Sequence, residues 1–129
     1  MSNINVAIAD DNERIRQNLQ EIISKEKDMT LVGSASDGLD TLSMIRTSHP
    51  DVVLLDIIMP KMDGLKVLEE INKDESSLKK PAFIILTALG QEEVMEEAIG
   101  LGADYVILKP FERTSLIKKI RQIKNGKRI

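Results

Sequence analysis

DVVLLDIIMP, residues 51–60, places four apolar side chains directly before an acidic residue, Asp56. An apolar run of this length is typical of a strand that is buried on both faces, as in the parallel sheets of α/β proteins. In open sheets of this kind, ligands bind outside the carboxyl ends of the strands. Asp56 therefore stands where such a fold places its functional side chains.

Three further apolar runs in the chain also end in polar residues. INVAIADD ends in Asp10 and Asp11, FIILT ends in Thr87, and YVILK ends in Lys109. Parallel strands present their carboxyl ends at one edge of a sheet, so we expect these side chains to lie near Asp56. That edge would collect three carboxylates, a hydroxyl and an ammonium group.

The whole chain alternates between β-rich runs and amphipathic patterns with helical spacing. This (βα)5 alternation predicts an α/β fold with a doubly wound, parallel, five-stranded sheet, and the flavodoxin-like strand order 2-1-3-4-5 is the leading choice. Strands are expected at 4–9, 30–35, 52–56, 82–87 and 104–108, and helical spacing joins Ile15 to Ile23, Leu39 to Ile45, Leu65 to Ile71, Val94 to Leu101 and Leu116 to Ile123.

Length and composition limit the possible classes. The 129 residues suit a single domain spanning 1–129, and the net charge of −3 gives no overall attraction to nucleic acid. With no cysteine and one histidine, the chain has no disulfides, no thiolate metal site and no histidine-clustered zinc site. Residues 1–9 lack the basic start and long apolar core of a signal peptide, and no apolar stretch reaches the roughly 20 residues that span a bilayer. We expect a cytoplasmic protein that does not enter a membrane.

The expected carboxylate cluster requires a compensating cation. Neighbouring strands lie about 4.8 Å apart, so carboxylates at the ends of the first and third strands repel each other strongly. An oxygen-rich, water-accessible site suits Mg²⁺, which takes one or two carboxylates and substrate phosphate oxygens. Asp56 is then the predicted nucleophile of a phosphoryl transfer, Lys109 supplies a point charge, and Thr87 supplies a hydroxyl donor.

Each of these residues also has a plain structural interpretation. Asp10 and Asp11, with Asn12, suit the cap of the first helix. Asp56 suits a turn, Thr87 an ordinary strand position, and Lys109 a solvated loop. The coincidence of all of them at strand ends favours a common site.

These motifs resemble the receiver domain of two-component response regulators. The resemblance covers the whole chain and rests on Asp10-Asp11, on the run from Asp56 to Gly64, on Thr87-Ala88 and on Lys109-Pro110-Phe111. It implies that Asp56 accepts a phosphoryl group from the phosphohistidine of a sensor kinase or phosphotransferase. It also implies that Asp11, Asp56 and the main-chain carbonyl of Ile58 hold Mg²⁺, or another divalent cation such as Mn²⁺ or Ca²⁺, with Asp10 assisting.

The same resemblance implies roles for two further residues. Thr87 and Lys109 grip the phosphoryl oxygens, and the Lys109–Pro110 peptide bond matches a family position that is cis. One position departs from the family pattern, because Val106 stands where many receivers carry a switching aromatic residue. Tyr105 lies one place earlier and should point to the opposite face of its strand.

Longer matching segments narrow the resemblance to receivers of sporulation transcription factors. They include AIADDN, LLDIIMPKMDGLKVLE, LTALGQEEV and LGADYVILKPF. The effector domain that contacts DNA in such proteins is absent from these 129 residues. A free-standing, single-domain phosphorelay intermediate remains the alternative.

The resemblance further implies a conformational switch that favours dimers. Phosphorylation should draw Thr87 and residues 88–91 inward and alter the surface of the fourth helix, fifth strand and fifth helix. Two copies then pair through this face with complementary charge, although solvated charged faces explain the same composition. The charged residues are Glu92, Glu93, Glu96 and Glu97 on the fourth helix, and Lys118, Lys119 and Arg121 on the fifth.

Two other functional classes fit the sequence less well. Phosphatases of the haloacid dehalogenase type carry an acid/base aspartate two residues after the nucleophile, where this chain has Ile58. Without that general acid, we expect a phospho-acceptor that loses phosphate slowly and is not a turnover enzyme. A flavodoxin-like cofactor carrier needs a phosphate-cradling loop after the first strand, but ADDNERI supplies carboxylates there.

Overall fold

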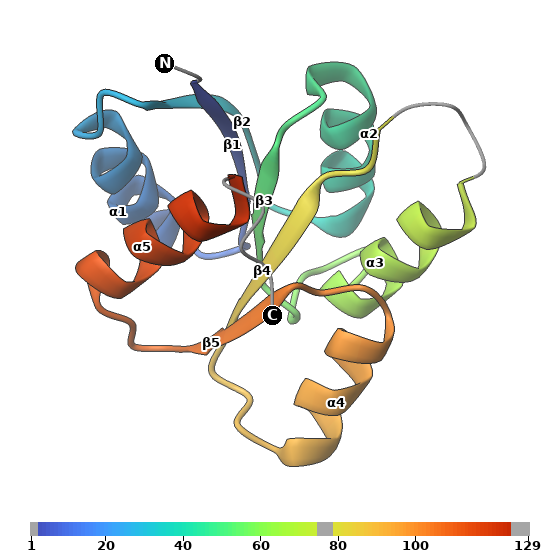
Figure 1. Ribbon diagram of the computed structural model, residues 1–129. Coiled ribbons are helices and arrows are strands. Elements are labelled where there is room, and N and C mark those ends of the chain that lie inside the picture. Colours follow the sequence, from blue (N-terminus) through green and yellow to red (C-terminus); the bar gives the residue numbers. More distant parts are fainter. Residues whose placement is uncertain (1–2, 75–78, 125–129) are drawn as a thin grey trace.

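The computed structural model describes residues 3–74 and 79–124 of the chain. Strands and helices alternate throughout, as Figure 1 shows. The elements are β1 (Ile4–Ala9), α1 (Glu13–Ser24), β2 (Met29–Ala35), α2 (Gly38–Ser48), β3 (Val52–Leu55), α3 (Gly64–Lys73), β4 (Ala82–Thr87), α4 (Glu92–Gly100), β5 (Tyr105–Leu108) and α5 (Arg113–Lys124).

The five strands form one parallel sheet in the order β2-β1-β3-β4-β5. This confirms the predicted fold class and strand order. The pairing aligns the carboxyl ends of the central strands, because Ala9 of β1 is opposite Leu55 of β3 and Leu55 is opposite Ile85 of β4. The segments that follow β1, β3 and β4 therefore leave the sheet at the same edge.

Helices cover both faces of this sheet (Figure 1). On one face, α1 and α5 pack against alternate strand residues in a cluster that includes Leu19, Ile120 and Leu54. On the other face, α2, α3 and α4 form a second cluster that includes Leu68 and Leu55. Leu54 and Leu55 are neighbours in β3 yet belong to opposite cores, as the two-residue repeat of a strand requires.

The burial pattern explains why the central strands read as continuous apolar runs. Every residue of β3 and of β4 is buried, so neither strand has a solvated face. The edge strands β2 and β5 keep partly exposed positions. Burying a side chain such as Leu54 contributes roughly 2 kcal/mol, and this contribution holds the site-bearing strands in place.

Helix α1 begins with a side-chain cap that settles one sequence-based alternative. Asn12 is the N-cap residue, and its side chain accepts a hydrogen bond from the Ile15 amide. Asp10 instead accepts a hydrogen bond from the Asn12 amide at 2.9 Å. Capping therefore explains Asn12, while Asp10 and Asp11 remain before the helix at the sheet edge.

Within residues 3–74 and 79–124, none of the helices has the length and apolar character needed to cross a membrane.

Candidate functional site

The polar residues just beyond the carboxyl ends of the strands form backbone hydrogen bonds with neighbouring strands. The Asp56 amide donates to the Ala9 carbonyl at 2.9 Å, and the Asp10 amide donates to the Ala35 carbonyl at 3.1 Å. Beyond β4 and β5, the Lys109 amide donates to the Thr87 carbonyl at 2.8 Å. Asp10, Asp56 and Lys109 are thus each held by a backbone hydrogen bond to the neighbouring strand.

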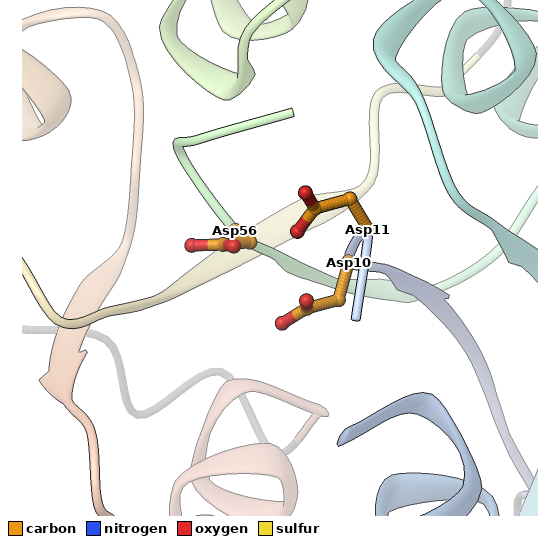
Figure 2. Close-up of side chains that lie close together, drawn as sticks. All are labelled: Asp10, Asp11 and Asp56. Atoms are coloured by element: carbon orange, nitrogen blue, oxygen red, sulfur yellow. The ribbon is translucent and has the colours of Figure 1, made fainter. Parts of the chain in front are cut away.

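Three carboxylates gather at this edge, beyond the ends of β1 and β3 (Figure 2). Asp10, Asp11 and Asp56 each offer an oxygen atom, and these atoms lie within 4.8 Å of one another. Asp10 is 1% exposed and Asp56 is 7% exposed, whereas Asp11 is exposed to solvent. The cluster is therefore buried at Asp10 and Asp56 and accessible to solvent at Asp11.

Lys109 reaches the same cluster from the end of β5. Its Nζ atom lies 2.7 Å from Asp10 Oδ2 and 3.4 Å from Asp56 Oδ2. Only 16% of the Lys109 side chain is exposed, so the ammonium group is held largely out of water. Three carboxylates and one ammonium group leave the site with an excess of negative charge.

The electrostatic environment of Asp56 disfavours its charged form. Burial raises the pKa of Asp56 above its ordinary value, and the nearby charge of Asp10 raises this pKa further. Lys109 and a hydrogen bond from the Ile57 amide to Asp56 Oδ1, at 2.8 Å, oppose the shift without reversing it. A bound cation would relieve this unfavourable charge.

The donor set fits a hard divalent cation. Carboxylate oxygens with access to water are the ligands that Mg²⁺ prefers. Asp11 supplies the exposed oxygen, and the predicted carbonyl ligand, Ile58, lies two residues after Asp56 in the loop before α3. The preceding carbonyl, that of Ile57, already accepts a hydrogen bond from the Gly64 amide at 2.8 Å.

Thr87 is fully buried at the end of β4, and its hydroxyl group already has a partner. Its Oγ1 atom accepts a hydrogen bond from the Leu89 amide at 3.0 Å. This bond ties the start of the β4–α4 loop to the Thr87 side chain. A change in the direction of the hydroxyl group would therefore also disturb the loop.

The structure confirms two expectations about β5 and its end. The Lys109–Pro110 peptide bond is cis. Tyr105 and Val106 point to opposite faces, since Tyr105 packs with the α1–α5 cluster and Val106 with the α2–α3–α4 cluster. The Lys119 Nζ atom lies 4.4 Å from the centre of the Tyr105 ring, which is a cation–π contact.

The basic residues of α5 differ in their contacts. Arg121 forms ion pairs within the chain, at 2.7 Å to Glu26 and 2.9 Å to Asp28, and its side chain is 43% exposed. These contacts join α5 to the turn between α1 and β2. Lys118 remains exposed, as do the four glutamates of α4.

Sequence reasoning missed two residues that support the site. Arg16 donates a hydrogen bond to the main-chain carbonyl of Asp10 at 2.7 Å. Asp37 is buried at the start of α2 and lies 3.6 Å from Lys61, in the loop after β3. A helical arginine and a capping aspartate are common features, and the sequence alone gives no signal that these two face the site.

Comparisons with known proteins agree with this geometry. The model of the response regulator receiver domain family matches residues 6–121. The putative response regulator NarL of Mycobacterium tuberculosis has a signal receiver domain that is 28% identical to this chain, with a TM-score of 0.90 over 98% of this chain and 99% of that one.

Two further solved structures are similar in the same way. A DNA-binding response regulator of the LuxR family from Staphylococcus aureus is 32% identical, with a TM-score of 0.87 over 95% of this chain and 99% of that one. The complex of CheX, CheY, BeF3 and Mg from Borrelia burgdorferi contains a chain that is 28% identical, with a TM-score of 0.84 over 94% of this chain and 89% of that one. The chain belongs to the response regulator receiver domain family.

Proposed function

We propose that Asp56 is the phospho-acceptor of this receiver domain and takes its phosphoryl group from the phosphohistidine of a sensor kinase or phosphotransferase. The observation that carries this proposal is the pairing of a buried aspartate, at the end of the central strand β3, with the ammonium group of Lys109. An oxygen of Asp56 forms a bond to phosphorus, the phosphorus–nitrogen bond of the donor breaks, and the imidazole nitrogen leaves with the electron pair.

Lys109 and Thr87 are the proposed partners of the phosphoryl oxygens. Phosphoryl transfer has a loose transition state with charge spread over these oxygens, so positioned charges and donors supply most of the catalysis. Lys109 already lies 3.4 Å from Asp56 and can follow the charge as it develops. Thr87 can donate a hydrogen bond from its hydroxyl group to a phosphoryl oxygen. The hydrogen bond that its Oγ1 atom accepts from the Leu89 amide is then either retained or broken.

Asp11, Asp56 and the Ile58 carbonyl are the proposed ligands of Mg²⁺, with Asp10 acting directly or through water. The excess negative charge of the site and its hard oxygen donors support this assignment. When bound, the cation neutralises charge on the phosphoryl oxygens. Mn²⁺ or Ca²⁺ could occupy the same donor set. The BeF3 and Mg in the complex that contains Borrelia CheY are consistent with this chemistry.

The residue at position 58, Ile58, favours a phospho-acceptor that loses its phosphoryl group slowly over an enzyme that hydrolyses phosphate repeatedly. Its side chain stands where a haloacid dehalogenase-type enzyme has its general acid, and it is 58% exposed and apolar. It cannot donate a proton to a leaving group. We propose that the phosphoryl group stays on Asp56 long enough to alter the surface of the domain.

The proposed output is a phosphorylation-dependent dimer through α4, β5 and α5. Turning the Thr87 hydroxyl toward the phosphoryl group would weaken its bond to Leu89 and so shift the β4–α4 loop. The exposed glutamates of α4 and the exposed Lys118 of α5 supply complementary charge for a second copy. Arg121 already pairs with Glu26 and Asp28 and is 43% exposed, so its charge is only partly available to a second copy.

Within the family, we propose a role in the initiation of sporulation in the cytoplasm, as the receiver of stage zero sporulation protein A. The long segments shared beyond the site residues, such as LLDIIMPKMDGLKVLE, support this assignment. DNA would then be bound by an effector domain outside the residues 1–129. The similarity to a DNA-binding regulator from S. aureus is consistent with such an output. A single-domain phosphorelay intermediate is the alternative, and the length of the natural reading frame would distinguish the two.

Phosphorylation by acetyl phosphate with Mg²⁺ tests the central assignment. We expect wild-type protein and Asp63→Asn, which keeps an N-cap side chain on α3, to be labelled, whereas Asp56→Asn stays unlabelled. Mass spectrometry of peptides should place the phosphoryl group on Asp56. Equal labelling of Asp56→Asn would contradict the assignment. Light scattering with beryllofluoride tests the dimer, which an unchanged monomer mass would contradict.

A further inference from the structure

Two residues at the start of α2, Asp37 and Gly38, contact the loop that joins β3 to α3. This loop spans residues 56–63 and carries Ile58, the proposed carbonyl ligand of the metal ion. Asp37 and Gly38 themselves are not among the proposed ligands. Asp37 is nevertheless buried, with only 6% of its surface exposed, and the proposed phosphoryl chemistry does not use it.

The loop is folded closely on itself. The Gly64 amide donates to the Ile57 carbonyl at 2.8 Å, and the Met62 amide donates to the Pro60 carbonyl at 2.7 Å. Lys61 adopts a left-handed conformation with φ of 68°, which is uncommon for a residue other than glycine. Contacts from outside the loop support a turn of this kind, and α2 is one of the elements that contact it.

Gly38 supplies one part of that support. Its amide donates to the Pro60 carbonyl at 3.3 Å. A Cβ atom at position 38 would overlap the carbonyl oxygen and the Cβ atom of Met62, so the absence of a side chain permits this approach. Backbone therefore packs directly on backbone, and the loop cannot move toward α2.

Asp37 supplies the other part. Its Oδ1 atom accepts a hydrogen bond from the Asp40 amide at 2.8 Å and so caps α2, while its carbonyl accepts a bond from the buried Thr41 hydroxyl at 2.7 Å. Its Oδ2 atom lies 3.6 Å from Lys61 Nζ, so the same carboxylate reaches across to the loop. The first turn of α2 therefore contacts residues 60–62 through the Gly38 backbone and through the Asp37 carboxylate, the ion pair with the exposed Lys61 being the weaker of the two.

We propose that Asp37 and Gly38 are positioning residues for metal binding. By contacting residues 60–62 of the loop, they set the position of the Ile58 carbonyl, which lies two residues before this contact. This inference rests on the proposed function, because it takes Ile58 as a metal ligand. Residues that orient metal ligands from outside the coordination sphere typically change metal affinity about 10-fold to 100-fold when they are replaced.

Metal affinity, measured separately from folding, tests this proposal. We expect Gly38→Ala to weaken Mn²⁺ binding, measured by electron paramagnetic resonance and by competition with Mg²⁺, by about 10-fold. Gly100→Ala is the matched control, because a Cβ atom there has no neighbour within 4 Å. Labelling of Gly38→Ala by acetyl phosphate should recover at saturating Mg²⁺, since Asp56 itself is intact.

A second pair of variants keeps the test decisive if Gly38→Ala does not fold. Asp37→Ala should weaken metal binding, and Asp37→Asn, which keeps the cap on α2 but removes the charge facing Lys61, should restore part of the affinity. Folded Gly38→Ala and Asp37→Ala proteins with wild-type metal affinity would overturn the proposal. Wild-type protein that binds neither Mn²⁺ nor Mg²⁺ would instead contradict the proposed function.

Discussion

Removing the positive charge of Lys109 should destabilise the metal-free protein, and added Mg²⁺ should reverse much of that loss. Lys109 lies 2.7 Å from Asp10 and 3.4 Å from Asp56, and both carboxylates are buried. At an effective dielectric constant of about 20, these separations give gross attractions of about 6 and about 5 kcal/mol. Desolvation of the three ions cancels several kcal/mol each, so the net value is much smaller.

Lys109→Met leaves the two buried carboxylates facing each other without a cation. Loss of one partner from a buried pair typically costs about 3–5 kcal/mol, and the 16% exposure of Lys109 favours the lower end. We expect a loss of about 3 kcal/mol, which lowers the melting temperature of a domain of this size by about 12 °C. A divalent cation bound between the carboxylates should restore more stability in the variant than it adds to the wild type.

Urea unfolding at several Mg²⁺ concentrations would measure both effects. Lys66→Met is the matched control, because its side chain is 47% exposed and its ion pairs lie on the surface. Such pairs contribute about 0–1 kcal/mol. A loss below about 1 kcal/mol for Lys109→Met, or equal Mg²⁺ effects in variant and wild type, would refute the electrostatic reasoning.

Three further predictions concern stability. Asp56→Asn should stabilise the metal-free protein near neutral pH. Because the pKa of Asp56 is raised in the fold, the wild type loses stability as the pH rises from the ordinary value of 3.8 through the raised pKa, and the gain should vanish in acid. Thermal unfolding across pH would show this. Arg121→Met should lower the free energy of unfolding by about 1 kcal/mol at neutral pH. Because Arg121 lowers the pKa of Asp28, the difference in stability from the wild type should disappear as the pH falls below the ordinary value of 3.8 and through the lowered pKa. Leu54→Ala should cost about 3–4 kcal/mol in urea unfolding, because Leu54 is 1% exposed between α1 and α5.

Most of the fold could be predicted because each strand is marked by its own apolar run. The run before Asp56 has no polar position, and in the structure every residue of β3 is buried. The prediction ended this strand at residue 56 and the structure ends it at Leu55, where Asp56 still bonds to β1 through its amide. The strand order followed from the alternation of strands and helices, which leaves few topologies.

The contacts that could not be predicted join segments far apart in the chain. Arg121 lies on a helix rich in basic residues, and no local pattern predicts that its guanidinium pairs with Glu26 and Asp28 in the turn between α1 and β2. Likewise, the contact of Gly38 with Pro60 depends on how α2 packs, and no local pattern encodes that distance. Helical spacing shows which side of a helix is apolar, but it does not show what the polar side meets.

The charge of the site also explains why metal and phosphoryl binding should depend on each other. Three carboxylates lie close together, and Lys109 pairs with two of them, Asp10 and Asp56. Burial and then the charge of Asp10 raise the pKa of Asp56, so the metal-free site disfavours a further negative charge. The proposed phosphorylation would replace the single charge of Asp56 with a phosphoryl group of about −1.5 to −2. That product would be less favourable still without a divalent cation, so the site should accept a phosphoryl group only when the cation is present. In the metal-free protein the carboxylates of Asp10, Asp11 and Asp56 repel one another. We expect Thr87 and Lys109 to change position when a bound cation and the phosphoryl group alter this charge distribution.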